Sequence, residues 1–211
     1  DAIKYLIDNT DDEILSEELS YSLNALSDVI LDFIDIYLRP ELNQSKYYNN
    51  GHEEPINRRS ELSKKLSEIC EETYKDYPII NNEILNKNTL SSQAINSRSK
   101  VIAGILENHI KENIGLIATG QDVSFMRSTI KNEGILVEKA GQYYINTENL
   151  KNKKLQNVLN LIKKFIVNSS VKQLSFKELY NILTEPANHI GMKMGLIPIY
   201  IACVLHHYKK Y

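Results

Sequence analysis

The sequence predicts a mainly α-helical protein that contains a winged-helix-like unit. Three observations lead to this fold class. Apolar residues recur at three- and four-residue steps along most of the 211 residues, which is the period of helices with one buried face. Near residues 135–146, two β-prone runs flank a turn and predict one β-hairpin. Two further helical segments, joined by a glycine-containing connector, predict a second helix-turn-helix-like pair at the C-terminal end.

The composition is that of a globular protein, with 42% hydrophobic and 25% charged residues. No apolar run reaches the ~18 residues of a membrane span. The start, "DAIKYLIDNTDDEIL", lacks the basic region and apolar core of a signal peptide and has no initiator Met. We therefore expect a segment of a larger cytoplasmic protein. Cys70 and Cys203 stand at apolar-periodic positions, which predicts two buried free thiols rather than a disulfide.

Charge is unevenly distributed along the chain. Residues 1–59 hold 13 acidic and 5 basic residues, a net of −8, whereas residues 60–211 hold 14 acidic and 20 basic residues, a net of +6. A basic C-terminal part can approach phosphate, but this excess is small for its length. A solvated lysine-rich surface is the favoured interpretation.

In the N-terminal part, residues 1–76, the sequence predicts two helices. A helix over 10–38 carries seven apolar residues on one face: Leu15, Leu19, Leu23, Leu26, Ile30, Ile34 and Tyr37. Thr10 followed by Glu13 fits a capping box, and Pro40 ends the helix. The polar stretch "NQSKYYNNGHEEP" predicts an exposed loop, and a second helix follows over 60–77.

The middle part, residues 77–148, predicts the winged-helix-like unit. A helix over 91–113 is followed by a short helix over 123–133, which Asp122 caps and Gly134 ends. In the second helix Val123, Met126 and Ile130 face inward. A hairpin over 135–146 turns at Ala140-Gly141. Helix, short helix and hairpin follow in the order of a winged helix, and a helical domain with an incidental hairpin is the alternative.

The C-terminal part, residues 149–211, predicts three helices. The first, over 150–167, buries Leu155, Val158, Leu159, Ile162 and Phe165. The second, over 175–184, begins with a capping box of Ser175 and Glu178. The stretch "IPIYIACVLHHYKK" is apolar on most faces and predicts a buried helix.

Motifs of catalysis are missing from the sequence. The eight glycines are scattered and form no phosphate-binding loop, and no spacing of Cys or His fits a zinc site. His206 and His207 are neighbours, so we expect one to pack and the other to face water. His109 falls on the apolar face of its helix, which favours a structural role. We predict a non-catalytic segment without a cofactor or metal.

Nucleic-acid binding is the more substantial possibility. In a winged helix the second helix enters the major groove and the wing reaches the backbone. Here that helix would expose Arg127 and Lys131, and the wing carries Lys139. Glu133 and Glu138 dilute this positive charge. We therefore expect DNA contact to be weak and non-specific, with protein docking as the favoured role and a DNA-binding regulator as the alternative.

The stretch "YPIINNEILNKNTLSSQAINSR" carries a polar corner between two helices, formed by Asn82, Glu83, Asn86, Lys87 and Arg98. Asn and Ser side chains satisfy exposed backbone groups at such junctions, and Glu83 can pair with Lys87 or Arg98. A hydrogen-bonded structural corner is favoured over a ligand or partner contact.

This stretch resembles a pattern of very large bacterial P-loop ATPases, including those of phage-defence islands. The matching residues are Tyr77, Pro78, Asn82, Glu83, Leu85, Asn86, Lys87, Ser91, Ser92, Ala94 and Arg98. A second block, Ile190 to Pro198, is similar to a glycine-punctuated turn of that family, although Ala187 and Asn188 replace its proline pair. The resemblance spans residues 60–205. It implies a non-catalytic helical region that follows an ATPase core and couples nucleotide state to DNA or to other domains of the same protein.

Overall fold

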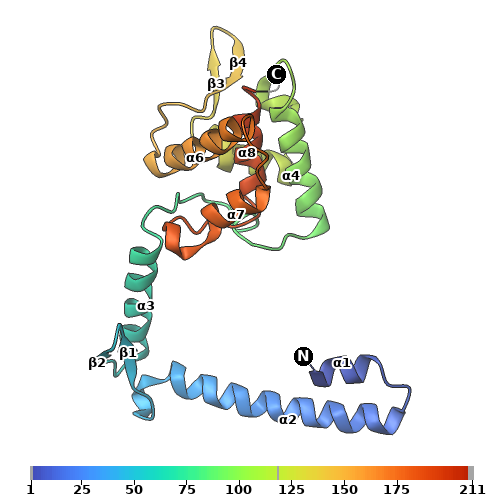
Figure 1. Ribbon diagram of the computed structural model, residues 1–211, viewed down its shortest axis with the longest axis vertical. Coiled ribbons are helices and arrows are strands. Elements are labelled where there is room, and N and C mark those ends of the chain that lie inside the picture. The colour runs from blue at the N-terminus through green and yellow to red at the C-terminus, as the bar shows by residue number, and fades with distance from the viewer. Residues whose placement is uncertain (1, 118, 209–211) are drawn as a thin grey trace. The chain divides into compact units, whose positions relative to one another are not determined.

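The computed structural model describes residues 2–117 and 119–208, and it is mainly helical (Figure 1). Within this part of the chain, eight α-helices and two antiparallel β-hairpins form, and the helical share is 57%. The predicted mainly α-helical class is therefore confirmed. The chain divides into two compact units, residues 1–70 and 71–211, which are described in turn.

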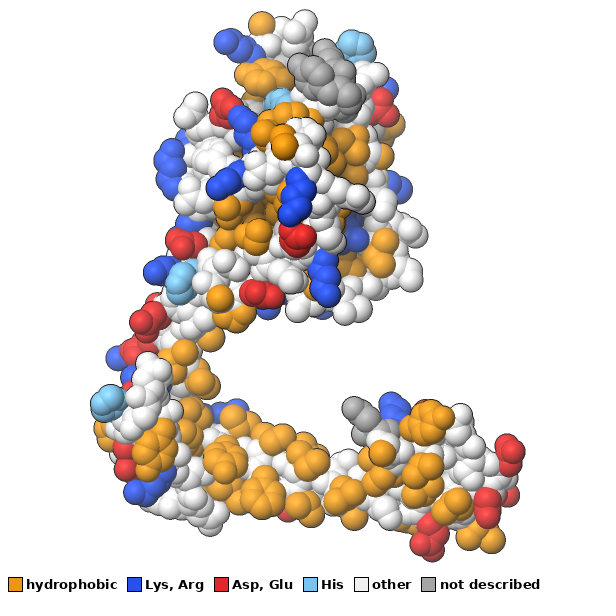
Figure 2. All heavy atoms as spheres, in the orientation of Figure 1, with side chains coloured by type: hydrophobic (Ala, Val, Ile, Leu, Met, Phe, Trp, Pro, Cys, Tyr) orange, Lys and Arg blue, Asp and Glu red, His pale blue; other side chains and the backbone are white. Residues whose placement is uncertain are grey.

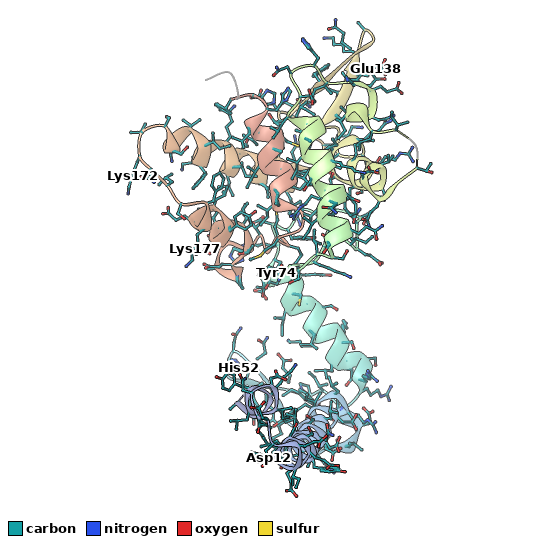
Figure 3. The ribbon with its side chains drawn as sticks, turned by 90° about the vertical axis from the view of Figure 1, so that its right-hand side faces the viewer. Asp12, His52, Tyr74, Glu138, Lys172 and Lys177 are labelled. Atoms are coloured by element: carbon teal, nitrogen blue, oxygen red, sulfur yellow. The ribbon has the colours of Figure 1, made fainter. Side chains whose placement is uncertain are left out.

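The first unit begins with two helices, α1 (Ala2–Asp8) and α2 (Glu13–Leu38). Asp12 caps α2, because its Oδ1 accepts hydrogen bonds from the backbone N–H of Ile14 (3.0 Å) and Leu15 (3.1 Å). Asp12 stands at the start of this helix in Figure 3. The predicted capping box of Thr10 and Glu13 is therefore wrong. Thr10 lies before the cap, where its hydroxyl accepts from the N–H of Asp12 at 3.3 Å.

The stretch after α2 forms a hairpin, which corrects the predicted exposed loop. Strands β1 (Tyr47–Asn49) and β2 (His52–Glu54) pair antiparallel after a short 3₁₀ turn, η1 (Pro40–Leu42). Asn50 and Gly51 have φ angles of +49° and +82°, as the tight turn of a two-residue hairpin needs. The hairpin is fixed to both flanking helices. Tyr47 Oη donates to the carbonyl of Tyr37 (2.7 Å) on α2, and Lys65 on α3 (Arg59–Thr73) pairs with Glu54 at 2.6 Å.

Burial is sparse in the first unit. Among its described residues, 2–70, only Pro40 and Leu62 are buried, and α2 buries none. The apolar stripe predicted for α2 is therefore largely exposed. Cys70 is a free, exposed thiol, so the prediction that it is buried is wrong. Its position follows the apolar period of α3, but that helix buries Leu62 alone and offers the thiol no core.

The second unit holds one continuous hydrophobic core. It is built from α4 (Ser92–Ile105), α5 (Gln121–Met126), α6 (Lys153–Ser169), α7 (Phe176–Thr184) and α8 (Ile197–Leu205). Helix α8 lies between α4 and α6 (Figure 1) and buries seven of its nine residues. The predicted buried helix is thus confirmed as far as Leu205, and residues 209–210 of the predicted stretch lie outside the described residues.

The core face of α6 follows the sequence, because all five residues predicted to be buried on α6 are buried. Ser175 caps α7 by accepting from the N–H of Lys177, but no bond from its own N–H to Glu178 completes the predicted capping box among the described residues. Asn152, which was not predicted as a cap, caps α6. Cys203 on α8 is buried and free, as predicted. Its burial raises the pKa of its thiol well above the ordinary range.

Helix α4 is shorter than predicted. It ends at Ile105, not near Asn113, with Leu106 as its C-cap. Asn113, Ile114 and Gly115, where the predicted helix would have ended, have left-handed φ angles of +47°, +53° and +78°. His206 Nδ1 donates a hydrogen bond to the carbonyl of Ile105 at 2.7 Å, which satisfies one of the free carbonyls at the helix end. His109 therefore lies beyond the helix and is exposed, which corrects its predicted place on an apolar face.

The predicted hairpin is confirmed. Strands β3 (Leu136–Lys139) and β4 (Gln142–Ile145) pair antiparallel, and Leu136 stands opposite Ile145. Ala140 and Gly141 form the turn with φ angles of +52° and +76°. The hairpin projects from the helices of its unit in Figure 1. No helix in the described part of the chain is both long and apolar enough to cross a membrane.

The helix before this hairpin contains a π-helical turn. Helix α5 runs into η3 (Arg127–Lys131), where the N–H of Asn132 bonds to the carbonyl of Arg127 at 2.9 Å. Val123, Met126 and Ile130 are buried, as predicted. Gly120 stands at the N-cap instead of Asp122, whose carboxylate accepts from the N–H of Val123 within the first turn.

Candidate interaction sites

The polar corner is a tight turn held by its own asparagine side chains. Asn82 Oδ1 accepts a hydrogen bond from the N–H of Leu85 at 3.0 Å. Asn86 Nδ2 donates to the carbonyl of Ile80 at 2.7 Å, and Tyr77 Oη donates to Asn86 Oδ1 at 3.0 Å. Burial raises the pKa of the Tyr77 phenol, which keeps this donor protonated. The asparagines supply backbone partners that helix and sheet would otherwise provide, while Ile80 and Leu85 fill the core beneath.

Glu83 and Lys87 differ from the expectation. Both side chains are exposed, and none of the ion pairs between described residues joins Glu83 to Lys87 or Arg98. Arg98 instead reaches two backbone carbonyls, with Nη1 3.4 Å from Met194 O and 3.3 Å from Gly195 O. A guanidinium is a pure donor, so carbonyls can serve as acceptors for Nη1, whereas the buried Nε of Arg98 has no hydrogen-bond partner among the described residues.

The second motif segment, 190–198, packs directly on the polar corner. The N–H of Gly195 donates to the carbonyl of Lys87 at 3.0 Å, and the N–H of Met194 donates to Asn88 Oδ1 at 3.4 Å. A Cβ on Gly195 would overlap the carbonyl oxygen of Leu85. Only glycine therefore lets the two backbones approach this closely. Sequence reasoning named both segments but did not place them together, because nothing local to either one reveals the other.

The corner is also joined to the π-helical turn. Asn82 Nδ2 donates to Ser128 Oγ at 2.9 Å, and Ser128 Oγ donates in turn to the carbonyl of Ser124 at 2.9 Å. On the core side of this turn, the buried Tyr200 places its hydroxyl 3.4 Å from the carbonyl of Thr129. The π-helical turn is thus held between the polar corner and α8.

The residues predicted to contact DNA lie on the outer side of this region. Arg127 and Lys131 are exposed and stand one turn apart on η3, and Lys131 Nζ donates to Asn113 Oδ1 at 3.2 Å. A shallow hollow beside Arg127 is lined by Gly120, Ser124 and Ser128. Lys139 is exposed at the end of β3, on a different element. Arg127 and Lys131 therefore share one helical segment, whereas Lys139 comes from the wing.

Acidic groups accompany these cations. Glu138 is exposed on the projecting hairpin, as its label in Figure 3 shows, directly before Lys139. Glu133 is half-buried, and its Oε2 accepts from Asn152 Nδ2 at 3.0 Å. The carboxylates lower the positive potential that a phosphate backbone would meet.

A groove beside β4 contains His207. It is lined by Glu148, Lys163, Val204, His207 and Tyr208, together with residues 144–147. Lys163 pairs with Glu148 at 3.1 Å. Although much of its side chain is exposed, His207 is partly shielded from water by the groove, which lowers its pKa, while Glu148 opposes that shift. His206 is half-buried and His207 is exposed, as the sequence analysis expected.

The described residues bring together no group of three or more His, Cys, Asp or Glu that could hold a metal ion. Neither a protein-family model nor a curated protein nor a solved structure matches the chain. Function therefore has to be argued from the contacts of the polar corner, the π-helical turn and the exposed surfaces.

Proposed function

We propose that the chain is a non-catalytic interaction module of a larger bacterial P-loop ATPase. It would couple the ATPase to partner domains or to DNA, in a system such as phage defence. The observation that carries this proposal is the contact between the two segments on which the resemblance rests. Residues 77–98 and 190–198 meet through Gly195, Lys87 and Arg98.

The chemistry of this contact favours a mechanical role over a ligand site. The amides of Asn82 and Asn86 and the Nη1 group of Arg98 are already bonded to groups of the chain itself, whereas the Nε of Arg98 lacks a partner in the described part of the chain. A ligand would have to replace these bonds at a cost of about 1 kcal/mol each or more. The corner instead fixes the π-helical turn relative to α8, so that movement at one segment would be transmitted to the other.

The elements around the corner support a winged-helix interpretation. Helix α4 packs on α5, the η3 turn follows, and the β3–β4 hairpin would be the wing. Helices α7 and α8 would form the second helix-turn-helix-like pair. Winged helices serve both as DNA-binding units and as docking modules, and the carboxylates of Glu133 and Glu138 favour docking here.

Direct DNA binding by a regulator is the second candidate. The observation that favours it is the exposure of Arg127 and Lys131 one turn apart on the segment that would enter the major groove. Their neighbour Ser128 is held by Asn82, which keeps this segment rigid.

The test uses the parent ATPase with Gly195→Ala, which forces the two segments apart, and with Met194→Ala as a neighbouring control. ATP turnover is measured with and without duplex DNA. We expect Gly195→Ala to abolish the response to DNA or to the partner while basal turnover remains. An unchanged response, with the corner shown to be displaced by hydrogen exchange, would contradict the proposal. So would a parent protein without a phosphate-binding loop.

A further inference from the structure

Helix α2 presents an apolar seam that nothing in its own unit fully covers. Leu19, Leu23, Leu26, Ile30, Phe33 and Tyr37 follow one another at alternating steps of four and three residues. This is the a/d spacing of a coiled coil, with Leu23, Ile30 and Tyr37 at a positions and the other three at d positions. Apolar side chains follow one another along α2 on the face seen in Figure 2.

Helix α1 accounts for only the first part of the seam. It packs on α2, and Leu19 and Leu23 are half-buried, as are Ile3 and Ile7 on α1. Beyond this point, Leu26, Ile30, Phe33 and Tyr37 remain 52%, 57%, 59% and 57% exposed. Monomeric proteins seldom leave a continuous apolar surface of this length in water.

The first unit does not stabilise α2 by burial. Pro40 and Leu62 are the only buried residues among residues 2–70. Helices gain most of their stability from packing an apolar face, and intrinsic propensity contributes little. A 26-residue helix with no buried side chain therefore needs another surface to bury its seam.

The positions of the charged residues on α2 indicate which kind of surface could cover the seam. The helix has no Lys or Arg. Its six acidic residues are Glu13, Glu17, Glu18, Asp28, Asp32 and Asp35. In the heptad frame Glu18, Asp28, Asp32 and Asp35 occupy c and f positions, away from the seam. Membrane surfaces are anionic and attract basic helices, so they do not fit this helix. A basic partner helix would find no carboxylate at the seam edges.

The seam edges suit a second copy of the same helix. The e and g positions that flank the a/d seam carry only uncharged side chains: Ser20, Ser22, Ser27, Val29, Ile34 and Ile36. Two identical helices can therefore approach without like charges facing one another. Ile30 at an a position beside Leu26 at a d position also suits a two-stranded arrangement.

We propose that two copies of this chain associate through α2, with the stretch Leu26–Tyr37 as the shared interface. The contact is isologous, because the same seam serves both copies. The uncovered seam spans only about two heptads, so the dimer is weak and depends on concentration. This proposal goes beyond the proposed function and does not depend on it.

The experiment is sedimentation equilibrium of the intact chain between about 1 and 100 µM, a range that brackets micromolar affinity. The wild-type mass is expected to rise from 24.3 kDa toward twice that value. The seam variant Ile30→Glu/Phe33→Glu is expected to stay monomeric at every concentration. The matched control Tyr21→Glu/Leu31→Glu adds the same charge at two residues that are 68% and 61% exposed at f and b positions. It should still dimerise.

Three results would overturn the proposal. The first is a wild-type chain that remains monomeric at the highest concentration. The second is a larger assembly, and the third is equal dissociation by the seam variant and its control. All four substituted side chains are exposed, so the variants keep the core of the second unit. Circular dichroism of each variant at low concentration checks that it has the same helix content as the monomeric wild type.

Discussion

Asn82 makes bonds with both ends of its amide, one to the N–H of Leu85 and one to Ser128 Oγ. Asn82→Ala removes both hydrogen bonds and leaves the N–H of Leu85 and the hydroxyl of Ser128 without this partner. We expect the free energy of unfolding to fall by about 1–2 kcal/mol, the scale of a lost capping or turn bond. Urea denaturation measures it. Asn81→Ala is the control, because this neighbour is exposed, and its effect should stay within about 0.5 kcal/mol. Equal effects of the two variants would show that the turn does not depend on Asn82.

The two cysteines should differ in reactivity toward a thiol reagent. Cys70 is exposed, whereas Cys203 is fully buried and its thiol pKa is raised, so little of its reactive thiolate exists. We expect one fast-reacting thiol in the native chain and two after unfolding in denaturant. A colorimetric thiol titration counts them, and Cys70→Ser should remove the fast phase. Two fast thiols in the native protein would contradict the burial of α8.

Gly195 is the close contact between the two motif segments. A methyl group at this position would overlap the carbonyl of Leu85, which belongs to the backbone and cannot rotate away. We expect Gly195→Ala to lower the free energy of unfolding by about 1–3 kcal/mol, the usual cost of overpacking. Thermal unfolding followed by circular dichroism measures the loss. Met194→Ala, at an exposed neighbour, should change stability little. A Gly195→Ala variant as stable as wild type would mean that the segments separate easily.

The elements that follow local rules were predictable from the sequence, and those that depend on distant contacts were not. Ala140-Gly141 and the caps Ser91, Asn152 and Ser175 follow directly from turn and capping chemistry, although the sequence analysis named only Ser175 as a cap. The Asn50-Gly51 hairpin was missed because polar residues around it hid a strong turn signal. The end of α4 at Ile105 was not predictable, because it involves a contact with α8, where His206 donates to the carbonyl of Ile105. The left-handed conformation of the β-branched Ile114 was not predictable either, since it is held by packing against Gly104.

The same distinction applies to the candidate site. The sequence indicated that Asn82 and Asn86 serve the backbone, since asparagine commonly does so in turns. Nothing in it could pair Arg98 with Met194 and Gly195, or Asn82 with Ser128, because these contacts join segments far apart along the chain. The predicted ion pair of Glu83 with Lys87 or Arg98 was wrong for the same reason. Backbone carbonyls reached Arg98 from a segment that its local sequence does not reveal.

At the scale of the whole molecule, the two units should differ in their protection from hydrogen exchange. The second unit has a continuous core, whereas residues 2–70 bury only Pro40 and Leu62. In dilute solution we expect the amides of α2 to exchange orders of magnitude faster than those of α6 and α8. Mass spectrometry of peptides resolves the difference. Slow exchange in α2 at the lowest concentration would show that this helix is stabilised within a single chain.

DNA binding by the chain should be weak and strongly dependent on salt. The exposed cations Arg127, Lys131 and Lys139 can each displace counterions, but Glu138 beside Lys139 opposes them. We expect affinity on the order of 10⁻⁴–10⁻⁶ M, the range of non-specific binding. Arg127→Ala and Lys131→Ala should each reduce the slope of log affinity against log salt by about one. Tight, sequence-selective retention of duplex DNA in a gel-shift titration would favour the DNA-binding regulator instead.

The π-helical turn at Arg127–Lys131 acts as an extra residue stored within a helix. If this turn tightened to an ordinary α-helical turn with no residue lost, the residues after it would rotate by about 100° about the helix axis. The β3–β4 hairpin would then leave the helix in a different direction. Deleting one residue within the turn would instead remove the bulge and roughly keep the direction of the hairpin, so the wide turn is what fits the extra residue into this helix.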